Sequence, residues 1–372
     1  MTNPIYKYIE QSEELEQLCQ SLPGTASVAV DTEFVRERTF YPHAGLIQLA
    51  TDDDIYLIDP VACDMSPFLQ ILENPHICKV MHSISEDMEV FMALGAHAPV
   101  NFFDTQIAAS WLGAGLSLSL QNLVKTHIGV ELSKSETRTN WLKRPLSEAQ
   151  LSYAAEDVQY LLQIAREQTE LLTSTQFIDY VREENKLLVV QPDEDHEMLY
   201  LNYGRAATFN SATLNRFQRL ISWRERVARR DDKPKPHILR DNDLSSMAVE
   251  CVTPEALAKF PLHRSFKRRY LNEVSAVLFE VSDKSLAPVK RLQDLPQGRQ
   301  LQKQLKEQLL KIADSKGIPV EVLPSKRILE QIIKSLYVPW YPPPKQWSGW
   351  RKSFIMSALE TLNVDIVPLE HP

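Results

Sequence analysis

Two carboxylates follow a short apolar run near the N-terminus. Residues 26–30 are small or β-branched and come after a proline–glycine turn, which predicts a buried strand. Side chains alternate between the two faces of a strand, so Asp31 and Glu33 point to one side and Thr32 to the other. Carboxylates that close repel each other unless they share a proton or bind a cation. The pair therefore predicts either a solvated strand end or a metal site.

A phenol and a carboxylate share one face of a predicted helix. Ser147 and Gln150 have the spacing of a capping box, which sets the start of this helix. Tyr153 and Asp157 are four residues apart, which places their Cβ atoms roughly 5–6 Å from each other. Such a pair can belong to one site, although an exposed helix face with a half-buried tyrosine has the same spacing.

A fifth candidate, Asp87, lies just beyond the predicted strand 77–81, at the start of another helix. Functional sites of α/β proteins collect at strand ends. The neighbouring acids Glu86 and Glu89 are explained by the positive end of the helix dipole, and Asp87 could share that role. If the acids instead converge, an all-oxygen ligand set favours Mg²⁺ or Mn²⁺.

The order of these motifs is similar to that of a known enzyme family. D-x-E at 31–33, H-x-x-x-E-D at 82–87 and Y-x-x-x-D at 153–157 resemble the DEDDy branch of 3′-to-5′ exonucleases, and more closely ribonuclease D. The segments 104–108 and 134–141 extend the resemblance. Ser83 stands where the superfamily often has asparagine, and Asn140 where ribonuclease D often has aspartate. Both departures concern substrate detail, because neither removes a metal ligand.

The resemblance implies a ribonuclease H-like mixed α/β sheet and a set of roles for the acids. Two divalent ions, Mg²⁺ or Mn²⁺, are expected on Asp31, Glu33, Asp87 and Asp157. Tyr153 is expected to orient the attacking water and help to deprotonate it, and Glu33 to grip the terminal 3′-hydroxyl as well. Among the lesser candidates, Asp104 is expected to cap a helix rather than to bind metal, and Trp141 to pack.

Charge is divided unevenly along the chain. Residues 1–210 carry a formal charge of −18 and residues 211–372 one of +10, which together give the net −8. A basic half is the electrostatic footprint of a nucleic-acid enzyme, although each basic run by itself could be a solvated helix face. The expected RNA contacts are Glu33, His82, Lys134, Arg138, Arg224, Arg229 and Arg230.

The domain organisation follows from length, composition and a second resemblance. A chain of 372 residues exceeds the usual size of a single core. We expect an exonuclease domain over 1–190, an acidic linker over 191–209, and two all-helical domains over 210–289 and 290–372. The first helical domain resembles the HRDC module, and a weak repeat of about 85 residues suggests a second, divergent copy.

The sequence thus predicts a 3′-to-5′ exoribonuclease that releases nucleoside monophosphates from RNA with a free 3′-hydroxyl, with tRNA precursors as substrates implied by the resemblance. The alternatives are a DNA 3′-to-5′ exonuclease in repair and an inert nucleic-acid-binding scaffold. The four cysteines are scattered, and no apolar stretch approaches the ~18 residues of a membrane span. We therefore expect a cytoplasmic protein without a membrane partner. A monomer is expected because a three-domain chain with a nucleotide-sized cleft needs no symmetric partner.

Overall fold

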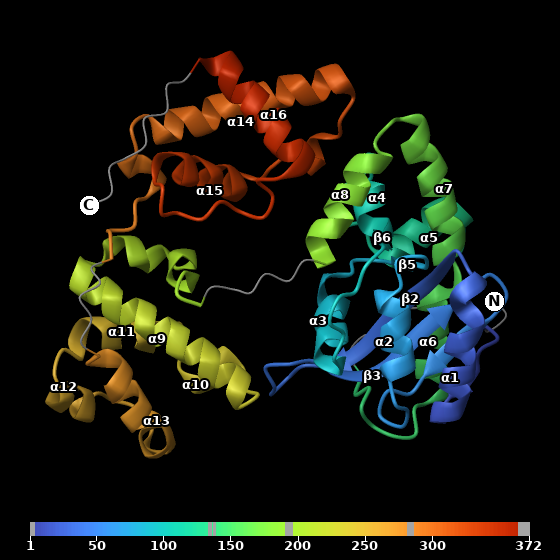
Figure 1. Ribbon diagram of the computed structural model, residues 1–372, viewed down its shortest axis with the longest axis horizontal. Helices are drawn as coiled ribbons and strands as arrows, with labels where there is room; N and C mark the ends of the chain where they lie inside the picture. Colours follow the sequence, from blue (N-terminus) through green and yellow to red (C-terminus); the bar gives the residue numbers. More distant parts are fainter. Residues whose placement is uncertain (1–3, 133–135, 137–138, 190–195, 281–285, 364–372) are drawn as a thin grey trace.

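The computed structural model describes residues 4–132, 136, 139–189, 196–280 and 286–363. They form an N-terminal α/β module (residues 4–189) and two helical modules, here called the middle module (196–280) and the C-terminal module (286–363), which lie to one side of it (Figure 1). The predicted fold class, a mixed α/β domain followed by helical domains, is confirmed. None of the helices in the described part of the chain combines the length and the apolarity needed to cross a membrane.

The N-terminal module is built around a six-stranded sheet in the order β1-β4-β3-β2-β5-β6. β3 is antiparallel to β2 and to β4, whereas β1 is parallel to β4, and β2, β5 and β6 are parallel to one another. The strands are β1 (Lys7–Ile9), β2 (Ser27–Val35), β3 (His43–Ala50), β4 (Ile55–Ile58), β5 (Cys78–Met81) and β6 (Phe102–Asp104).

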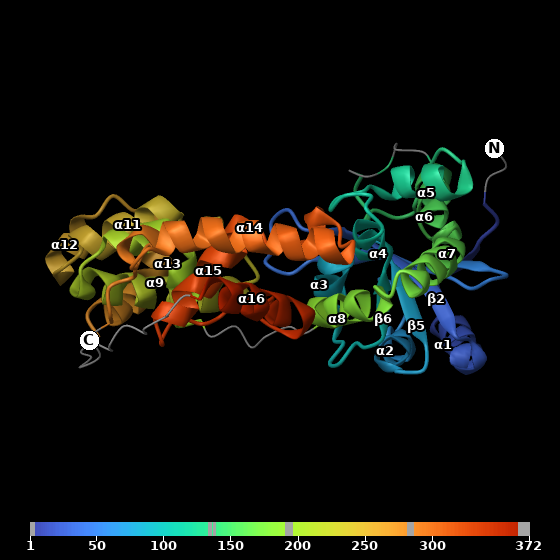
Figure 2. The ribbon, with the colours of Figure 1, turned by 90° about the horizontal axis from the view of Figure 1, so that it is seen from above.

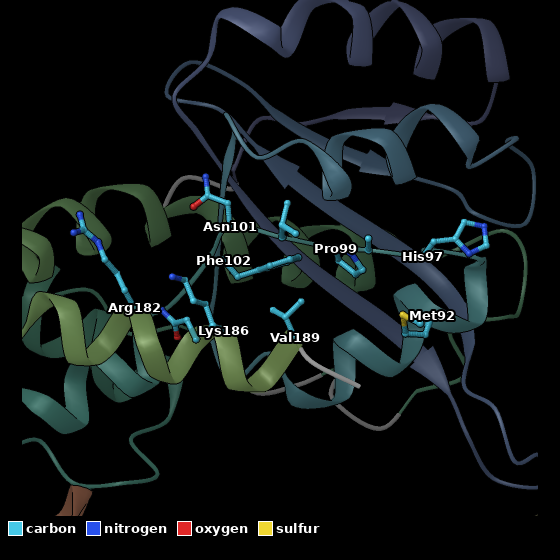
Figure 3. A pocket seen from close by; sticks show the side chains of 11 residues that line it. Met92, His97, Pro99, Asn101, Phe102, Arg182, Lys186 and Val189 are labelled. Atoms are coloured by element: carbon cyan, nitrogen blue, oxygen red, sulfur yellow. The ribbon is translucent and has the colours of Figure 1, made fainter. Parts of the chain in front are cut away.

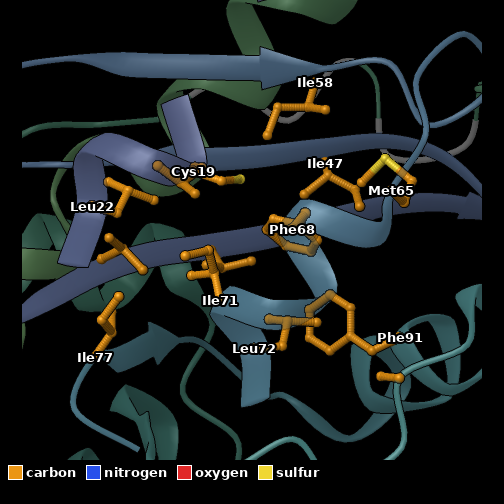
Figure 4. Packing of buried hydrophobic residues seen from close by; sticks show 14 of the residues in the cluster. Cys19, Leu22, Ile47, Ile58, Met65, Phe68, Ile71, Leu72, Ile77 and Phe91 are labelled. Carbon is orange, nitrogen blue, oxygen red and sulfur yellow. The ribbon is translucent and has the colours of Figure 1, made fainter. Parts of the chain in front are cut away.

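Helices cover both faces of this sheet. α1 (Ser12–Ser21), α2 (Ser66–Glu73) and α3 (Ser85–Leu94) enclose one core, in which Phe68 and Phe91 are fully buried against Ile47 (Figure 4). The remaining helices of the module are the short turn η1 (Leu22–Gly24), α4 (Thr105–Trp111), α5 (Leu120–Ile128), α6 (Glu148–Gln159), α7 (Leu161–Ser174) and α8 (Ile178–Val189). α6 and α7 pack on the opposite face.

β2 continues through the predicted site instead of ending before it. Its parallel partner β5 pairs only as far as Ala29, whereas its antiparallel partner β3 pairs through Val35. The segment that holds Asp31 and Glu33 therefore projects past the end of β5 while remaining hydrogen-bonded on its other side. The backbone that carries the two carboxylates is therefore held rigidly by β3, while β5 no longer covers the other edge of β2 at these residues.

The middle module begins earlier than expected. The turns η2 (Leu199–Asn202) and η3 (Gly204–Thr208) bury Tyr200 and Ala206 in the core of this module, so the predicted linker 191–209 is too long. The acidic run that ends at Glu197 suggested a linker, but the apolar residues that follow it pack against α9. The helices that follow are α9 (Ser211–Arg230), α10 (Lys235–Ile238), α11 (Asp241–Glu250), α12 (Pro254–Lys259) and α13 (Arg264–Leu278).

The C-terminal module repeats part of this arrangement. Its elements are η4 (Leu292–Asp294), α14 (Gly298–Lys316), η5 (Val320–Val322), α15 (Lys326–Tyr337) and α16 (Gly349–Leu362). Ala228 of α9 and Ala313 of α14 are both fully buried, and each long helix leads through a short turn to a helix with a fully buried leucine, Leu244 or Leu329. The order of elements thus agrees with the repeat predicted from the sequence.

Both helical modules touch the N-terminal module. In the β2–β3 connection the backbone N–H groups of Phe40 and Tyr41 each donate to Asp232 at the end of α9, over 2.9 Å (Figure 1). In the C-terminal module Trp350 packs against both Trp111 and Tyr180 and donates its indole N–H to Glu184 of α8. Figure 2 shows α16, the helix that carries Trp350, next to α8. The N-terminal module therefore contacts the middle module and the C-terminal module at two separate places.

Candidate active site

Three of the predicted acids converge. Oxygen atoms of Asp31 and Glu33 on β2 and of Asp157 on α6 all lie within 4.8 Å of one another. The alternation of β2 turns both of its carboxylates toward α6, and the capping box of Ser147 with Gln150 sets the phase of that helix as predicted. The acids thus meet because a strand and a helix, separated by more than a hundred residues, pack face to face.

Asp87 joins this group from the other side of β2. It lies in the first turn of α3 and is buried, and Thr32 donates its hydroxyl to the Asp87 carboxylate. Thr32 points away from Asp31 and Glu33, as strand alternation requires. Thr32, the residue between Asp31 and Glu33, therefore orients Asp87, the fourth carboxylate of the group.

Burial and nearby negative charges raise the pKa of all four carboxyl groups. Desolvation is the larger cause for each, and the charges of Asp87, Asp157 and Glu33 add to it at Asp31, whose pKa lies well above the usual range. The pKa of Glu33 is raised to about 9, and those of Asp87 and Asp157 to about 7. A divalent cation removes this cost by neutralising the charges, so the residues fit a metal centre.

The folded protein should become less stable as pH rises and more stable when a divalent metal binds. Because these carboxyl pKa values are higher in the folded than in the unfolded chain, the metal-free protein is expected to lose stability as pH rises from about 5 to about 9. Saturating Mg²⁺ at pH 8 should raise the melting temperature by several degrees, since a ligand at 100 times its Kd adds about 2.7 kcal/mol. Thermal denaturation with EDTA or Mg²⁺ measures both effects. Equal melting curves at pH 8 contradict a metal site.

Tyr153 lies beside the acids. Its hydroxyl group makes a hydrogen bond with Asp157 that opposes the rise in the pKa of that carboxyl. Its ring packs at 6.3 Å from that of Trp141, and both residues are buried. The phenol is therefore held rigidly next to the cluster, and the predicted packing role of Trp141 is confirmed.

A polar scaffold that sequence reasoning missed holds Trp141 in place. The Arg144 guanidinium donates twice to Asp59, over 2.6 Å each, and also to the carbonyl oxygens of Trp141 and Gly45. Tyr8 completes it by donating to Asp59 over 2.7 Å. No local pattern signals these pairs, because their members lie on elements far apart in the chain.

Gly45 is expected to be sensitive to substitution. A Cβ atom there would meet the Trp141 Cβ at 2.6 Å and its carbonyl oxygen at 2.7 Å. Gly45→Ala should therefore cost about 1–3 kcal/mol of unfolding free energy, and lower activity by shifting the support of Tyr153. Urea denaturation and exonuclease rates measure the two effects. Gly24→Ala is the control, because nothing lies within 4 Å of its added Cβ; equal behaviour of the two variants contradicts the tight contact.

Gln48 is another residue that sequence reasoning missed. It pairs with Asp31 across β2 and β3 and is fully buried, and its amide has no hydrogen-bond partner within the described residues. Cross-strand partners point to the same face of a sheet, so this amide lies on the side of the acid cluster. A single glutamine in the apolar run 46–50 was the available signal.

His82 and Asp104 serve the fold of the site. The two His82 ring nitrogens bond Thr105 Oγ1 and the Leu118 carbonyl, each over 2.9 Å, and its contact with RNA stays a prediction. Asp104 caps α4, as predicted. Its carboxylate also accepts from the backbone N–H groups of Ser83 and Ile84, over 3.0 and 3.1 Å, and so anchors the turn that leads to Asp87.

The predicted RNA contacts in the middle module divide into two kinds. Arg224 is 3% exposed and donates to the Leu239 carbonyl and the Tyr203 hydroxyl, so its predicted contact with RNA is wrong. Arg224 lies on the buried face of the amphipathic helix α9. The many basic residues around it in the sequence made this buried position hard to recognise. Arg229 and Arg230 are partly exposed and engage Glu225, Asp231 and Glu273. Lys134 and Arg138 lie outside the described residues.

Comparisons with known proteins agree with this fold and site. Residues 6–172 match the family model described as 3′-5′ exonuclease, and residues 213–278 match the HRDC domain. The fold and the acid site therefore define a 3′-to-5′ exonuclease. The HRDC match covers the middle module alone, so the second, divergent copy over 290–372 stays a prediction.

Relatives over nearly the full length specify the family. The chain is 33% identical to ribonuclease D of Haemophilus influenzae over 363 residues, which cover 94% of this chain and 90% of the relative. It is 32% identical to ribonuclease D of Escherichia coli K12, over 96% of this chain and 98% of the relative. The crystal structure of Escherichia coli RNase D, described as an exoribonuclease involved in structured RNA processing, superposes with a TM-score of 0.89 and covers 96% of this chain and 98% of that one. The chain belongs to the ribonuclease D family, and its activity is that of a 3′-to-5′ exoribonuclease.

Proposed function

We propose that this exoribonuclease trims the 3′ ends of tRNA precursors by two-metal-ion hydrolysis, acting as a monomer in the cytoplasm. The convergence of Asp31, Glu33 and Asp157 within 4.8 Å, with Asp87 held beside them by Thr32, carries the proposal. The four described cysteines are all free, in keeping with a reducing compartment. The near full-length relatives named ribonuclease D support RNA as the substrate.

The chain's own residues supply binding and orientation. Asp31, Glu33, Asp87 and Asp157 would hold two divalent ions, Mg²⁺ or Mn²⁺, whose chemistry is to acidify water and to stabilise the leaving 3′-oxygen. Tyr153, hydrogen-bonded to Asp157, orients the attacking water. Glu33 also accepts a hydrogen bond from the terminal 3′-hydroxyl. That contact gives the reaction its direction.

Phosphate contacts come from cations outside the acid cluster. Arg230 can exchange its exposed ion pair with Glu273 for an RNA phosphate, since such a pair contributes little by itself. Arg229, whose guanidinium is 37% exposed, is proposed to contact phosphate while it keeps its pair with the buried Glu225. Lys134 and Arg138, in the polar segment that precedes α6, are proposed to contact the 3′ strand. Replacing either group by glutamine should weaken RNA binding and reduce its salt dependence.

The substrate is tested with matched nucleic acids. The protein is incubated with a 3′-extended tRNA, with single-stranded DNA of the extension sequence, and with the tRNA bearing a 3′-phosphate, and mononucleotide release is measured. We expect release from the first, much less from DNA, and none from the blocked end. Faster release from DNA supports the repair exonuclease instead, and no release from any of them supports the inert scaffold.

A further inference from the structure

The β2–β3 hairpin makes a contact that the acid cluster does not use. The tip of this hairpin is the connection 36–42. Asp232, just beyond α9, accepts the backbone N–H groups of Phe40 and Tyr41 on its Oδ1 atom, over 2.9 Å each. Nε2 of His43, the first residue of β3, lies 3.5 Å from the other carboxylate oxygen of Asp232. One side chain of the middle module therefore holds the tip of the hairpin and the start of β3.

The Phe40 ring is held by the same module. It packs against the hydrophobic core of the middle module. The Arg229 guanidinium lies 4.9 Å and Lys235 Nζ 5.9 Å from the ring centroid, both within the range of a cation–π interaction. Glu225, which is 2% exposed, pairs with these cations over 3.0 and 2.8 Å and so fixes their positions. The ring is thus held by side chains that are themselves fixed.

The hairpin depends on such a support because it projects past the rest of the sheet. β5 pairs with β2 only as far as Ala29, and beyond that residue β3 is the partner strand of β2 in the described part of the chain. A two-stranded hairpin is only marginally stable by itself. The register of β2 and β3 also shifts between Glu33 and Phe34, and such a bulge lets a strand bend next to a site. Figure 1 shows the hairpin reaching from the N-terminal module to the end of α9.

Another support of the hairpin is weak. Arg36 pairs with Glu89 on α3, but these side chains are 37% and 44% exposed, and a pair so exposed contributes little. The position of the tip therefore depends chiefly on the contact with the middle module. Because the chain runs directly from Glu33 into the tip, a displaced tip tilts the segment that carries this carboxylate.

We propose that the middle module positions Glu33 for catalysis through this contact, with Asp232 and Phe40 as positioning residues of the exoribonuclease. The proposal rests on the function proposed above, in which Glu33 binds metal and the terminal 3′-hydroxyl. A misplacement of about 1 Å can cost roughly 100-fold in rate, so a slight loosening of the hairpin is enough to slow the chemical step. The middle module then affects the reaction even with a substrate that does not touch it.

Two substitutions of Asp232 separate the contact from effects of charge and backbone. The backbone of Asp232 is left-handed, with a φ of 46°, a conformation that asparagine and glycine also adopt. Asp232→Asn and Asp232→Gly both remove the charge, but only asparagine keeps an oxygen that accepts from Phe40 and Tyr41. With the full chain, Mg²⁺ and a trinucleotide, Asp232→Gly should lower kcat roughly fivefold or more, whereas Asp232→Asn should stay within about twofold of the wild type.

The short substrate excludes a simple loss of RNA binding. Both phosphates of a trinucleotide lie at or next to the cleaved bond, so a lost phosphate contact in the middle module leaves its hydrolysis unchanged. If Asp232→Gly only raises the KM for a 3′-extended tRNA, the middle module is a binding surface and the proposal is overturned. Equal kcat values of the two variants on the trinucleotide overturn it as well.

Hydrogen exchange tests the contact without reference to activity. The amide hydrogens of residues 34–42 should exchange roughly tenfold faster in Asp232→Gly than in Asp232→Asn, because only glycine releases the tip. Phe40→Leu, which removes the ring from Arg229 and Lys235, should show the same increase and a similar fall in kcat. Unchanged exchange in both Asp232→Gly and Phe40→Leu contradicts a hairpin held by the middle module.

Lys186→Gln is the control for a surface substitution on the N-terminal module. This exposed residue of α8 lines a separate cavity of about 680 Å³, between α8 and the segment that connects α3 to β6 (Figure 3). None of the residues of the hairpin contact lines that cavity. The variant should therefore leave both the exchange of residues 34–42 and the kcat on the trinucleotide unchanged.

The role of Glu33 is tested separately. The wild-type protein should cleave a trinucleotide with a 3′-hydroxyl much faster than one with a 3′-deoxy end. Equal rates contradict the proposed contact of Glu33 with the hydroxyl. The difference in kcat between Asp232→Gly and Asp232→Asn still decides whether the hairpin contact positions the site.

Discussion

Replacing Asp31 by asparagine is expected to lower kcat/KM on a 3′-extended RNA by roughly 10³-fold or more, which corresponds to about 4 kcal/mol of transition-state stabilisation. Asp31 is the carboxylate on which the charges of Asp87, Asp157 and Glu33 all act. An amide at this position removes the negative charge that a divalent cation needs but keeps the size of the side chain. Mononucleotide release at saturating Mg²⁺ measures the loss.

The same variant should be more stable than the wild type in EDTA at pH 8. Its amide carries no charge to desolvate and no repulsion from the other acids, so the melting temperature should rise while activity falls. This combination separates a lost metal ligand from a damaged fold. Asp53→Asn, in the exposed β3–β4 turn, is the control and should leave both quantities unchanged. Activity of Asp31→Asn within threefold of the wild type would falsify the metal site.

The second large effect is expected for Tyr153→Phe. The substitution removes the hydroxyl group that bonds Asp157 and retains the ring that packs against Trp141. Activity should fall roughly 10²–10⁴-fold, the usual contribution of a group that positions or transfers a proton. Single-turnover rates with pre-bound RNA measure the chemical step directly.

Two further measurements show where the loss arises. RNA binding by Tyr153→Phe, measured with Ca²⁺ in place of Mg²⁺, should equal that of the wild type, since the hydroxyl acts on water and not on the substrate. Tyr160→Phe, at the end of the same helix, should keep full activity. A Tyr153→Phe enzyme that is as fast as the wild type shows that the phenol does not act on the attacking water.

Local patterns in the sequence predicted the elements of the site well. The alternation along β2, the capping box of α6 and the cap at Asp104 each depend on residues within a few positions of one another. Caps and strand alternation depend on residues close together in the sequence, so their geometry can be inferred without a tertiary structure. The acids could be assigned to one site because the motif order resembles a family that the comparisons confirm.

Predictions that depended on burial were less accurate. Arg224 and Arg230 lie on the same helix with similar neighbours in the sequence, yet Arg224 is 3% exposed and Arg230 is on the surface. Likewise, residues 199–208 follow an acidic stretch and still fold into the middle module. Which face of a helix becomes buried depends on the elements that pack against it, and this information is not local.

The sequence by itself determined which groups are proposed to do the chemistry, namely the four carboxylates and Tyr153, and the phase of the elements that carry them. Only the tertiary structure decided how they are supported, through Thr32 on Asp87, through Arg144 and Asp59 behind Trp141, and through the turn that Asp104 anchors. It alone revealed that Gln48, beside Asp31, is fully buried. The physical reason is range: caps and strand alternation act over a few residues, whereas burial and long-range hydrogen bonds exist only after distant segments have packed.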